Sequence, residues 1–158
     1  MKILRRGGVR ILAVFLLFAL MPALNAATSQ PLAGSAGAET LSTADRQKIQ
    51  RVIALQIRAF ERNDEAVAFS YSTPETRKYF GSSRTFMDMV RDNYSVLYMN
   101  TSRAFLDAAV IDGQVIQPLR IVTPGGETLV ALYTLERQPD REWRIGGCEL
   151  APSNLQST

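Results

Sequence analysis

Apolar residues recur every three or four positions in the stretch that begins near residue 42. The stripe consists of Ile49, Val52, Ile53, Ile57, Ala59 and Phe60. This period is that of an amphipathic α-helix with one broad buried face. Ser42 precedes the stripe and Asp45 follows three residues later, an acidic variant of the capping box. The pattern therefore predicts a long helix that starts at Ser42.

Capping signals predict two shorter helices after it. The segments "RNDE" and "STPET" each place a capping side chain before an acid in the first helical turn. We expect Asn63 or Asp64 to cap the first of these helices. Thr73 should cap the second, with Pro74 at its first helical position, and Gly81 should end it. These local roles account for most acids of this region, so we assign none of them to catalysis.

A further helix is predicted from Ser82 or Ser83 onward. Its apolar stripe consists of Phe86, Met89, Val90 and Tyr94. Asp88 and Asp92 fall outside this stripe. Asp92 stands two residues before Tyr94, so it should lie about 200° away around the helix axis and face water.

The period changes from about 3.6 to 2 in the last third of the chain, which is typical of β-strands. The turn signals "DG" at 112–113, "PGG" at 124–126 and "PD" at 139–140 divide it into four strands joined by three hairpins. Pro118 has no N–H to donate, so its strand should have an edge side or a bulge there. The third strand is apolar on both faces, with Leu129, Ala131, Tyr133 and Leu135 on one and Val130 and Leu132 on the other. We expect it to be central.

Helices followed by an antiparallel meander predict an α+β fold. We expect the N-terminal helices to pack on a curved four-stranded antiparallel sheet. A chain of 158 residues suits one domain, which these elements place at 42–151, followed by a flexible tail at 152–158.

Residues 1–26 have the order of a secretory signal peptide. A cationic start, "MKILRRGGVR", precedes an apolar run from about Ile11 to Leu24 and the small residue Ala26. We place cleavage after Ala26, with a neighbouring bond as the alternative. A membrane-anchoring helix is the rival interpretation, but a spanning helix needs about 20 apolar residues and this run is shorter. Residues 27–41 are small, polar and interrupted by Gly and Pro, which is typical of a disordered linker.

The basic net charge of the chain comes from this leader. The chain has 18 basic and 15 acidic residues, and its first 26 positions hold four basic and no acidic residues. The remainder therefore has 14 basic residues against 15 acidic ones. Phosphate binding requires clustered cations that the folded chain retains, so nucleic acid is excluded as a partner. We expect the membrane as a partner only during export, unless the leader is retained as an anchor.

The content of cysteine and histidine excludes several kinds of active site. The chain contains one cysteine, Cys148, and no histidine. A nucleophilic cysteine normally requires a nearby base, a Ser-His-Asp triad requires histidine, and most zinc sites require histidine or several cysteines. We therefore expect no metal and no cofactor, and we interpret Cys148 as a buried small hydrophobe. An exported chain with one cysteine has no internal disulfide, so its core must hold it together.

Three segments resemble an uncharacterised bacterial family, domain of unknown function 4864. They are "RAFERNDEAVAFSYSTPETRKYFG", "FMDMVRDNYSVLY" and "LYTLERQPDREWRIGGCEL", within a region from about Ala44 to Leu150. The last resembles a family ending in which a hairpin leads through a tryptophan to a Gly-Cys pair, with Arg141 here where glycine is expected. The resemblance implies the cone-shaped nuclear transport factor 2-like, or cystatin-like, superfamily. It implies a long first helix, a bent sheet and a hollow between them, but no activity.

Tyrosines would line the hollow that this resemblance implies. The candidate ligand-binding residues are Tyr71, Tyr94, Tyr98 and Tyr133. The carboxylates nearest to these elements are those of Asp88, Asp92 and Asp107. A tyrosine in such a place is commonly a core residue with a satisfied hydroxyl. A carboxylate acquires a functional role when burial and a specific partner perturb its pKa. We assign no catalytic residue.

Two functions of different classes remain open. The first is an exported, non-catalytic binding or interaction module with a small apolar cavity between helices and sheet. Its partner would be an unknown small apolar ligand or a protein, including a second copy of the chain bound through the sheet. The second is a small-molecule isomerase or dehydratase that uses tyrosine and aspartate as acid and base in the cavity. A carboxylate buried beside a tyrosine would favour the enzyme. In both cases the expected location is periplasmic or secreted.

Overall fold

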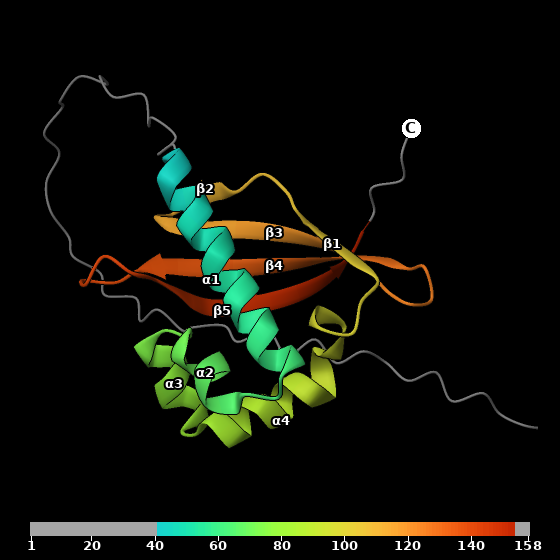
Figure 1. Ribbon diagram of the computed structural model, residues 1–158. Coiled ribbons are helices and arrows are strands. Elements are labelled where there is room, and N and C mark those ends of the chain that lie inside the picture. The colour runs from blue at the N-terminus through green and yellow to red at the C-terminus, as the bar shows by residue number, and fades with distance from the viewer. Residues whose placement is uncertain (1–40, 154–158) are drawn as a thin grey trace, which may run out of the picture. The chain divides into compact units, whose positions relative to one another are not determined.

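The computed structural model describes residues 41–153 as helices followed by an antiparallel sheet. The helices are α1 (Thr43–Glu61), α2 (Glu65–Ser70), α3 (Pro74–Phe80), α4 (Ser83–Asn93) and the 3-10 helix η1 (Ser95–Leu97). The strands are β1 (Ser102–Phe105), β2 (Ala109–Ile111), β3 (Gln114–Val122), β4 (Thr128–Arg137) and β5 (Trp143–Pro152) (Figure 1). The expected signal peptide over 1–26, the expected linker over 27–41 apart from Leu41, and residues 154–158 lie outside the described residues.

The stripe predicted from the sequence is the buried face of α1. Ser42 caps the helix, as predicted, by accepting a hydrogen bond from the N–H of Asp45 at 3.0 Å. Ile49, Ile53 and Ile57 are each no more than 1% exposed. Figure 1 shows α1 crossing one face of the sheet, so the stripe packs between helix and strands. This stripe joins the helical part of the domain to the β part.

The predicted caps of the two short helices are confirmed. Asp64 caps α2 by accepting from the N–H of Val67 at 3.2 Å. Asn63 before it has a left-handed backbone, φ 56°, which turns the chain from α1 into α2. Thr73 caps α3 by accepting from the N–H of Thr76 at 3.2 Å. The remaining two signals are also confirmed, with Pro74 in the first turn and Gly81 at φ 71° after the last.

The fourth helix differs from the prediction in one core residue. α4 buries Phe86, Met87 and Val90. Met89, which the predicted stripe included, is only half-buried. Met87 lies about 60° from Val90 around the helix axis and Met89 about 100°, so a face centred near Val90 takes Met87 first. Asp92 is exposed, as predicted.

Phe86 of α4 joins the four helices. Its ring centroid lies 6.1 Å from that of Phe60 in α1, 5.4 Å from Phe69 in α2 and 5.3 Å from Phe80 in α3. These separations are within the range of favourable aromatic pairs. The three short helices are therefore held to the C-terminal end of α1 by one aromatic cluster.

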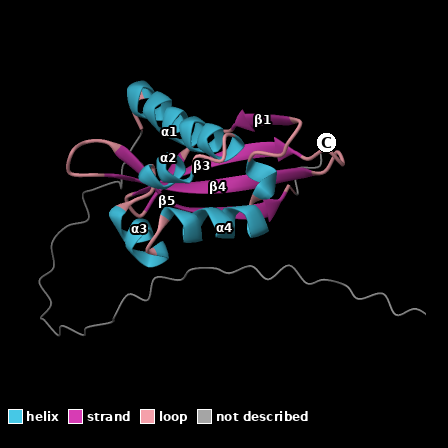
Figure 2. Ribbon diagram, turned by 60° about the horizontal axis from the view of Figure 1, so that its bottom comes forward, coloured by secondary structure: helices cyan, strands magenta, loops and turns pink. Residues whose placement is uncertain are grey.

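All strand pairs are antiparallel, and β3 and β4 are central in the sheet. The order is β1-β3-β4-β5, and β2 also pairs with β3. The predicted α+β class and the central third strand, β4, are confirmed. The predicted count of four strands is wrong, because the first predicted strand is divided into β1 and β2. The sheet is also not strongly curled (Figure 2), whereas a curved sheet was predicted.

Pro118 explains why the first strand is divided. Its carbonyl accepts from the N–H of Leu106 at 3.0 Å, so its missing N–H also faces this edge. The Leu106 carbonyl instead accepts a hydrogen bond from Nε2 of Gln117 at 2.7 Å. Pairing with β3 stops at Phe105 and resumes at Ala109. On this side β3 has no strand partner at Pro118, so the predicted edge side is present there and the alternative, a bulge, is not.

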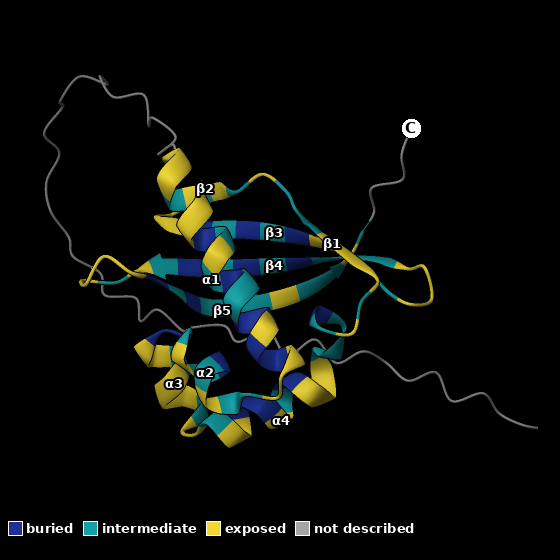
Figure 3. Ribbon diagram, in the orientation of Figure 1, coloured by how far each residue is buried: buried dark blue, intermediate teal, exposed yellow. Residues whose placement is uncertain are grey.

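Buried and less buried residues alternate along β3 and β4 (Figure 3), so the two faces of the sheet differ in burial. We call the face under α1 the inner face; in β3 and β4 its buried residues are Val115, Gln117, Leu119, Ile121, Ala131, Tyr133 and Leu135. The alternate residues of the two strands form the outer face, and they are half-buried or exposed. Figures 1 and 2 show α1 over one face of the sheet and α2–α4 beyond β5.

A bulge in β5 keeps its apolar side chains on the inner face. The register shifts between Thr134, which pairs with Gly147, and Leu135, which pairs with Ile145. Gly146 is therefore the additional residue in β5. Both sides of the bulge pair with inner-face positions of β4, through Trp143, Ile145, Cys148 and Leu150.

The segment between α2 and α3 covers the free edge of β5. Ile145 donates its N–H to the carbonyl of Tyr71 at 2.9 Å and accepts from the N–H of Thr73 at 2.9 Å. The hydroxyl of Thr76 donates to the carbonyl of Gly146 at 2.9 Å. These bonds satisfy backbone groups that an edge strand with a bulge leaves open. They also fix the short helices to the sheet.

Hairpins form at all three predicted turns, and one of them uses an unusual residue. Asp112 and Gly113 have φ 51° and 77° between β2 and β3, as a type I′ turn requires. Gly126 has φ 81° between β3 and β4. Between β4 and β5, Arg141 takes a left-handed conformation with φ 66°. Glycine adopts that conformation without strain, whereas a residue with a Cβ does not.

Truncation of Trp143 should be costly. The residue is 7% exposed, and its indole N–H donates to Oδ1 of Asp45 at 3.3 Å, which joins β5 to the first turn of α1. We expect Trp143→Ala to lower the free energy of unfolding in urea by about 3–5 kcal/mol. Trp143→Phe should lose less, because it keeps most of the apolar contact. A loss below about 1 kcal/mol for the alanine variant would show that the ring is not part of the core.

Relief of the strain at Arg141 should stabilise the domain. We expect Arg141→Gly to raise the free energy of unfolding by about 1 kcal/mol, measured by the same urea melts. Arg62 is the matched control, because it is also an exposed arginine in a turn but has φ −92°. Arg62→Gly should bring no gain, since no left-handed strain is released there. Equal changes in the two variants would contradict this explanation.

Candidate functional site

The four candidate tyrosines lie in different parts of the domain. Tyr133 is on the inner face of β4 and is 1% exposed. Tyr94 and Tyr98 flank η1 and are half-buried, and the ring of Tyr98 lies 6.2 Å from that of Phe60. Tyr71 ends α2 at the edge of β5. Only Tyr133 is a central core residue.

A row of three polar side chains crosses the inner face. Gln117 of β3, Tyr133 of β4 and Cys148 of β5 are consecutive cross-strand partners. The Nε2 of Gln117 donates to the carbonyls of Leu106 and Pro118 at 2.7 and 3.0 Å. Its Oε1 and the hydroxyl of Tyr133 are buried and have no hydrogen-bond partner within residues 41–153. Two buried polar atoms of this row are therefore unsatisfied.

Burial keeps these groups neutral. It raises the pKa of Tyr133 well above its ordinary value, and the neighbouring Cys148 thiol raises it further. Cys148 is half-buried beside the core, whereas a buried residue was predicted, and desolvation of its thiol raises the pKa to about 12. The pKa of Tyr94 is raised by burial first and then by the nearby Cys148 and Glu149. A thiol or phenol with a raised pKa is a poor nucleophile or base at neutral pH.

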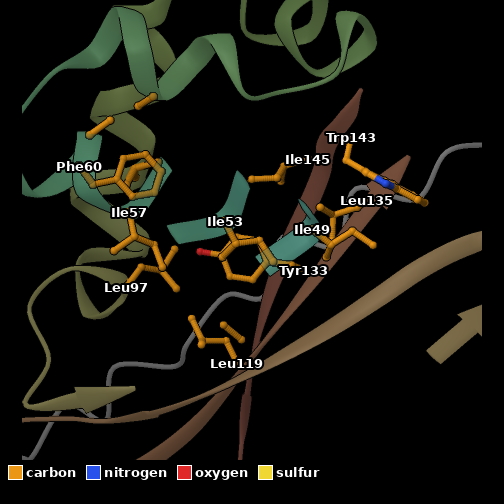
Figure 4. Packing of buried hydrophobic residues seen from close by; sticks show 14 of the residues in the cluster. Ile49, Ile53, Ile57, Phe60, Leu97, Leu119, Tyr133, Leu135, Trp143 and Ile145 are labelled. Carbon is orange, nitrogen blue, oxygen red and sulfur yellow. The ribbon is translucent and has the colours of Figure 1, made fainter. Parts of the chain in front are cut away.

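Side chains of α1 and its neighbours fill the space above this row. In Figure 4, Tyr133 lies among Ile53, Ile57, Leu97 and Leu119, and its hydroxyl points to the side on which Ile57 and Leu97 lie. Two surface hollows of the described chain lie elsewhere, one on the outer side of α1 and one beside Trp143. A ligand in the implied hollow would have to displace core side chains to reach Tyr133.

The candidate carboxylates lie at the surface. Asp88, Asp92 and Asp107 are exposed, and Asp88 forms an ion pair with Arg91 at 2.6 Å. A general base must lie within about 3 Å of the group that it deprotonates. No carboxylate of residues 41–153 is within hydrogen-bond distance of the Tyr133 hydroxyl.

The outer face of the sheet is apolar at its centre. We call its half-buried apolar residues on β3 and β4 the outer patch: Ile116, Pro118, Val122, Val130 and Leu132. None of them packs against the buried core cluster formed by the described residues. The helices lie over the other face or beyond β5 (Figures 1 and 2). No helix of residues 41–153 therefore covers the outer patch.

Two opposite charges flank the outer patch. Arg120 of β3 is the cross-strand partner of Val130, and Glu149 of β5 is that of Leu132. Both residues are exposed, and neither forms an ion pair within the described part of the chain. The sequence had placed Val130 and Leu132 on the second face of their strand. It did not reveal the patch, because alternation along a strand does not show whether another layer covers that face.

Residues 41–153 contain neither a cluster of metal-binding side chains nor a membrane-spanning helix. They hold no group of three or more Cys, Asp or Glu side chains placed to bind a metal ion. No helix in this part of the chain combines the length and apolar character needed to cross a bilayer.

Removal of the Tyr133 hydroxyl should not harm the fold. We expect Tyr133→Phe to leave the free energy of unfolding unchanged or to raise it by about 1–2 kcal/mol, because the variant removes a buried hydroxyl without a partner. Urea melts would measure the effect, and Tyr133→Leu would show the cost of losing the ring itself. A loss above about 1 kcal/mol for the phenylalanine variant would show that the hydroxyl has a partner in solution.

The comparisons with known proteins give a family and no individual relative. No curated protein and no solved structure matches the chain. The profile of one family, described as a domain of unknown function (DUF4864), matches residues 42–158. The match begins at the Ser42 cap and includes every helix and strand of the described chain. Since it covers more than half of the sequence, the protein belongs to the DUF4864 family.

Proposed function

We propose that the protein is a non-catalytic interaction module that binds a second copy of itself through the outer face of its sheet. The observation that carries the proposal is the outer patch, where two central strands expose apolar side chains. An antiparallel sheet with one solvated face normally carries polar residues there. Covering apolar surface gains roughly 25 cal/mol per Å². A second sheet packed about 10 Å away, face to face, would remove the patch from water.

The charges beside the patch favour a second copy over an unrelated partner. In a two-fold dimer one patch faces itself, so its features must complement each other. Arg120 and Glu149 lie on opposite sides of β4. A two-fold axis parallel to β4 exchanges these sides, which brings Arg120 of one protomer over β5 of the other, near its Glu149. Each dimer would contain this pair twice.

Binding inside the hollow and acid–base catalysis have less support. A small apolar ligand would compete with Ile53, Ile57 and Leu97 for the space above Tyr133. An isomerase or dehydratase would need a base there, and Asp92 and Asp107 are exposed instead.

We also propose that the signal peptide is cleaved after Ala26 and that the mature protein is periplasmic or secreted. The cationic and apolar order of residues 1–26 supports export. The proposal also includes membership of the nuclear transport factor 2-like superfamily, which the order of helices before an antiparallel sheet supports. An exported domain with one cysteine has no internal disulfide, so a dimer interface would add stability by mass action.

A charge in the outer patch should abolish the dimer. We expect the wild-type chain to sediment as a dimer and Leu132→Glu to raise the dimer dissociation constant by about 100-fold or more, because a buried unpaired carboxylate is costly. Met99→Glu is the control, since Met99 is 61% exposed and lies outside the sheet. Analytical ultracentrifugation over a concentration series would measure both.

Charge reversal tests the proposed arrangement itself. Arg120→Glu and Glu149→Arg should each weaken the dimer, because each places like charges together. The double variant should recover most of the affinity, since the pairs are restored with opposite sign. If the wild-type chain stays monomeric up to about 100 μM, the proposed dimer is contradicted. Recovery that fails in the double variant would rule out this pairing of β3 with β5.

A further inference from the structure

We propose that the hollow beside Trp143 binds a small zwitterion with an apolar side chain, such as a free apolar α-amino acid. The hollow measures about 310 Å³, which is at the small end of the range for ligand sites. It lies where the first turn of α1 meets the β2–β3 hairpin and the ends of β4 and β5. No residue of the outer patch lines it, so this inference does not depend on the proposed dimer.

Four apolar side chains form one part of the wall of the hollow. Trp143 lies at one end of the core cluster, beyond Leu135 and Ile49 (Figure 4). Val110, Val115 and Leu41 complete the apolar lining. Three aliphatic side chains and one indole suit a branched or aromatic side chain of the ligand. They offer little to a sugar or another polyol, whose hydroxyl groups need several hydrogen-bond partners.

An oriented carboxylate forms one side of the hollow. The carboxylate of Asp45 accepts from the hydroxyl of Ser42 at 2.7 Å and from the indole N–H of Trp143 at 3.3 Å. The hydrogen bonds from Ser42 and then Trp143 lower the pKa of Asp45 below its ordinary value, against a smaller opposing effect of burial, and the charges of Arg137 and Lys48 lower it further. The group is therefore ionised at neutral pH, and no cation of the described residues forms an ion pair with it.

A free guanidinium forms the opposite charge. Arg137 lines the hollow and has no ion pair or side-chain hydrogen bond within the described residues. It is near enough to Asp45 to lower the pKa of that carboxyl, yet the two groups are not within ion-pairing distance. Two opposite charges thus face one small hollow without forming an ion pair with each other.

A zwitterion complements this arrangement better than a single charge does. Its ammonium group can bind Asp45 and the face of the indole, while its carboxylate takes two parallel hydrogen bonds from Arg137. A ligand with only a carboxylate would bind Arg137 but would be repelled by the negative charge of Asp45. A ligand with only an ammonium group would bind Asp45 but would be repelled by the positive charge of Arg137. The charge pattern therefore discriminates among ligands with the same apolar body.

The only tryptophan of the chain reports on this hollow, so binding can be followed by its fluorescence. The full chain would be titrated with L-leucine, with isoamylamine, which lacks the carboxylate, and with 4-methylvalerate, which lacks the ammonium group. We expect a saturable change with L-leucine and at least about tenfold weaker binding of the other two. Glycine, which lacks the side chain, should also bind more weakly.

Variants of the two charged residues test which of them binds the carboxylate of the ligand and which binds its ammonium group. Arg137→Gln should weaken the binding of L-leucine at least about tenfold, so that L-leucine no longer binds more tightly than isoamylamine. In Asp45→Asn, L-leucine should no longer bind more tightly than 4-methylvalerate. The asparagine keeps a side-chain oxygen that can accept the hydrogen bond from Trp143. Arg84→Gln is the control, because Arg84 is an exposed arginine of α4 that does not line the hollow. Thermal melts would confirm that all three variants are folded.

Two results would overturn the proposal. One is the absence of any change in Trp143 emission, and of any shift of its indole N–H resonance, with L-leucine up to about 10 mM. The other is equal binding of L-leucine and either singly charged analogue, which would make the hollow a site for a simple anion or cation. Loss of binding in Arg84→Gln would place the ligand elsewhere on the chain.

Discussion

The packing of α1 against the inner face of the sheet is the contact on which the domain depends. Ile49, Ile53 and Ile57 are fully buried there, and the one cysteine of the chain leaves no internal disulfide to share the task. Full burial of such a side chain contributes about 1.5–3 kcal/mol. The short helices add to this core through Phe86, but they reach the sheet by way of α1 and the edge of β5.

This packing also decides what the inner face can do. The row of Gln117, Tyr133 and Cys148 lies under α1, where burial keeps the phenol and the thiol neutral. Gln117 has a structural role, because its amide replaces the donor that Pro118 lacks. The described interior is filled by side chains, and no carboxylate of residues 41–153 lies within hydrogen-bond distance of the Tyr133 hydroxyl. The two proposed binding surfaces, the outer patch and the hollow beside Trp143, lie outside that interior.

β5 links these surfaces to the core. Its bulge at Gly146 lets residues on both sides of the irregularity contribute to the inner face. Glu149 projects from the same strand beside the outer patch, and Trp143 begins it at the hollow. The segment between α2 and α3 fixes the strand where it bulges. A structural change in β5 would therefore alter both proposed binding surfaces.

The sequence by itself determined the local features of the chain. Caps such as Ser42 and turns such as Asp112-Gly113 involve groups a few residues apart, so their chemistry can be read from a short segment. Periodicity likewise identified the face of α1 and the two-faced apolar strand β4. Met87 was missed, because a short stripe fixes the buried arc of a helix only to within about one residue.

Only the tertiary structure decided which surfaces remain free. The division of the first strand depends on Pro118 in a neighbouring strand, and the bulge at Gly146 depends on the register with β4. The hollow exists because Asp45 and Trp143, 98 positions apart, meet at the start of α1. Whether a sheet face is covered depends on where the helices pack, and that is set by contacts between distant segments. A local pattern can show that a face is apolar, but not whether anything lies over it.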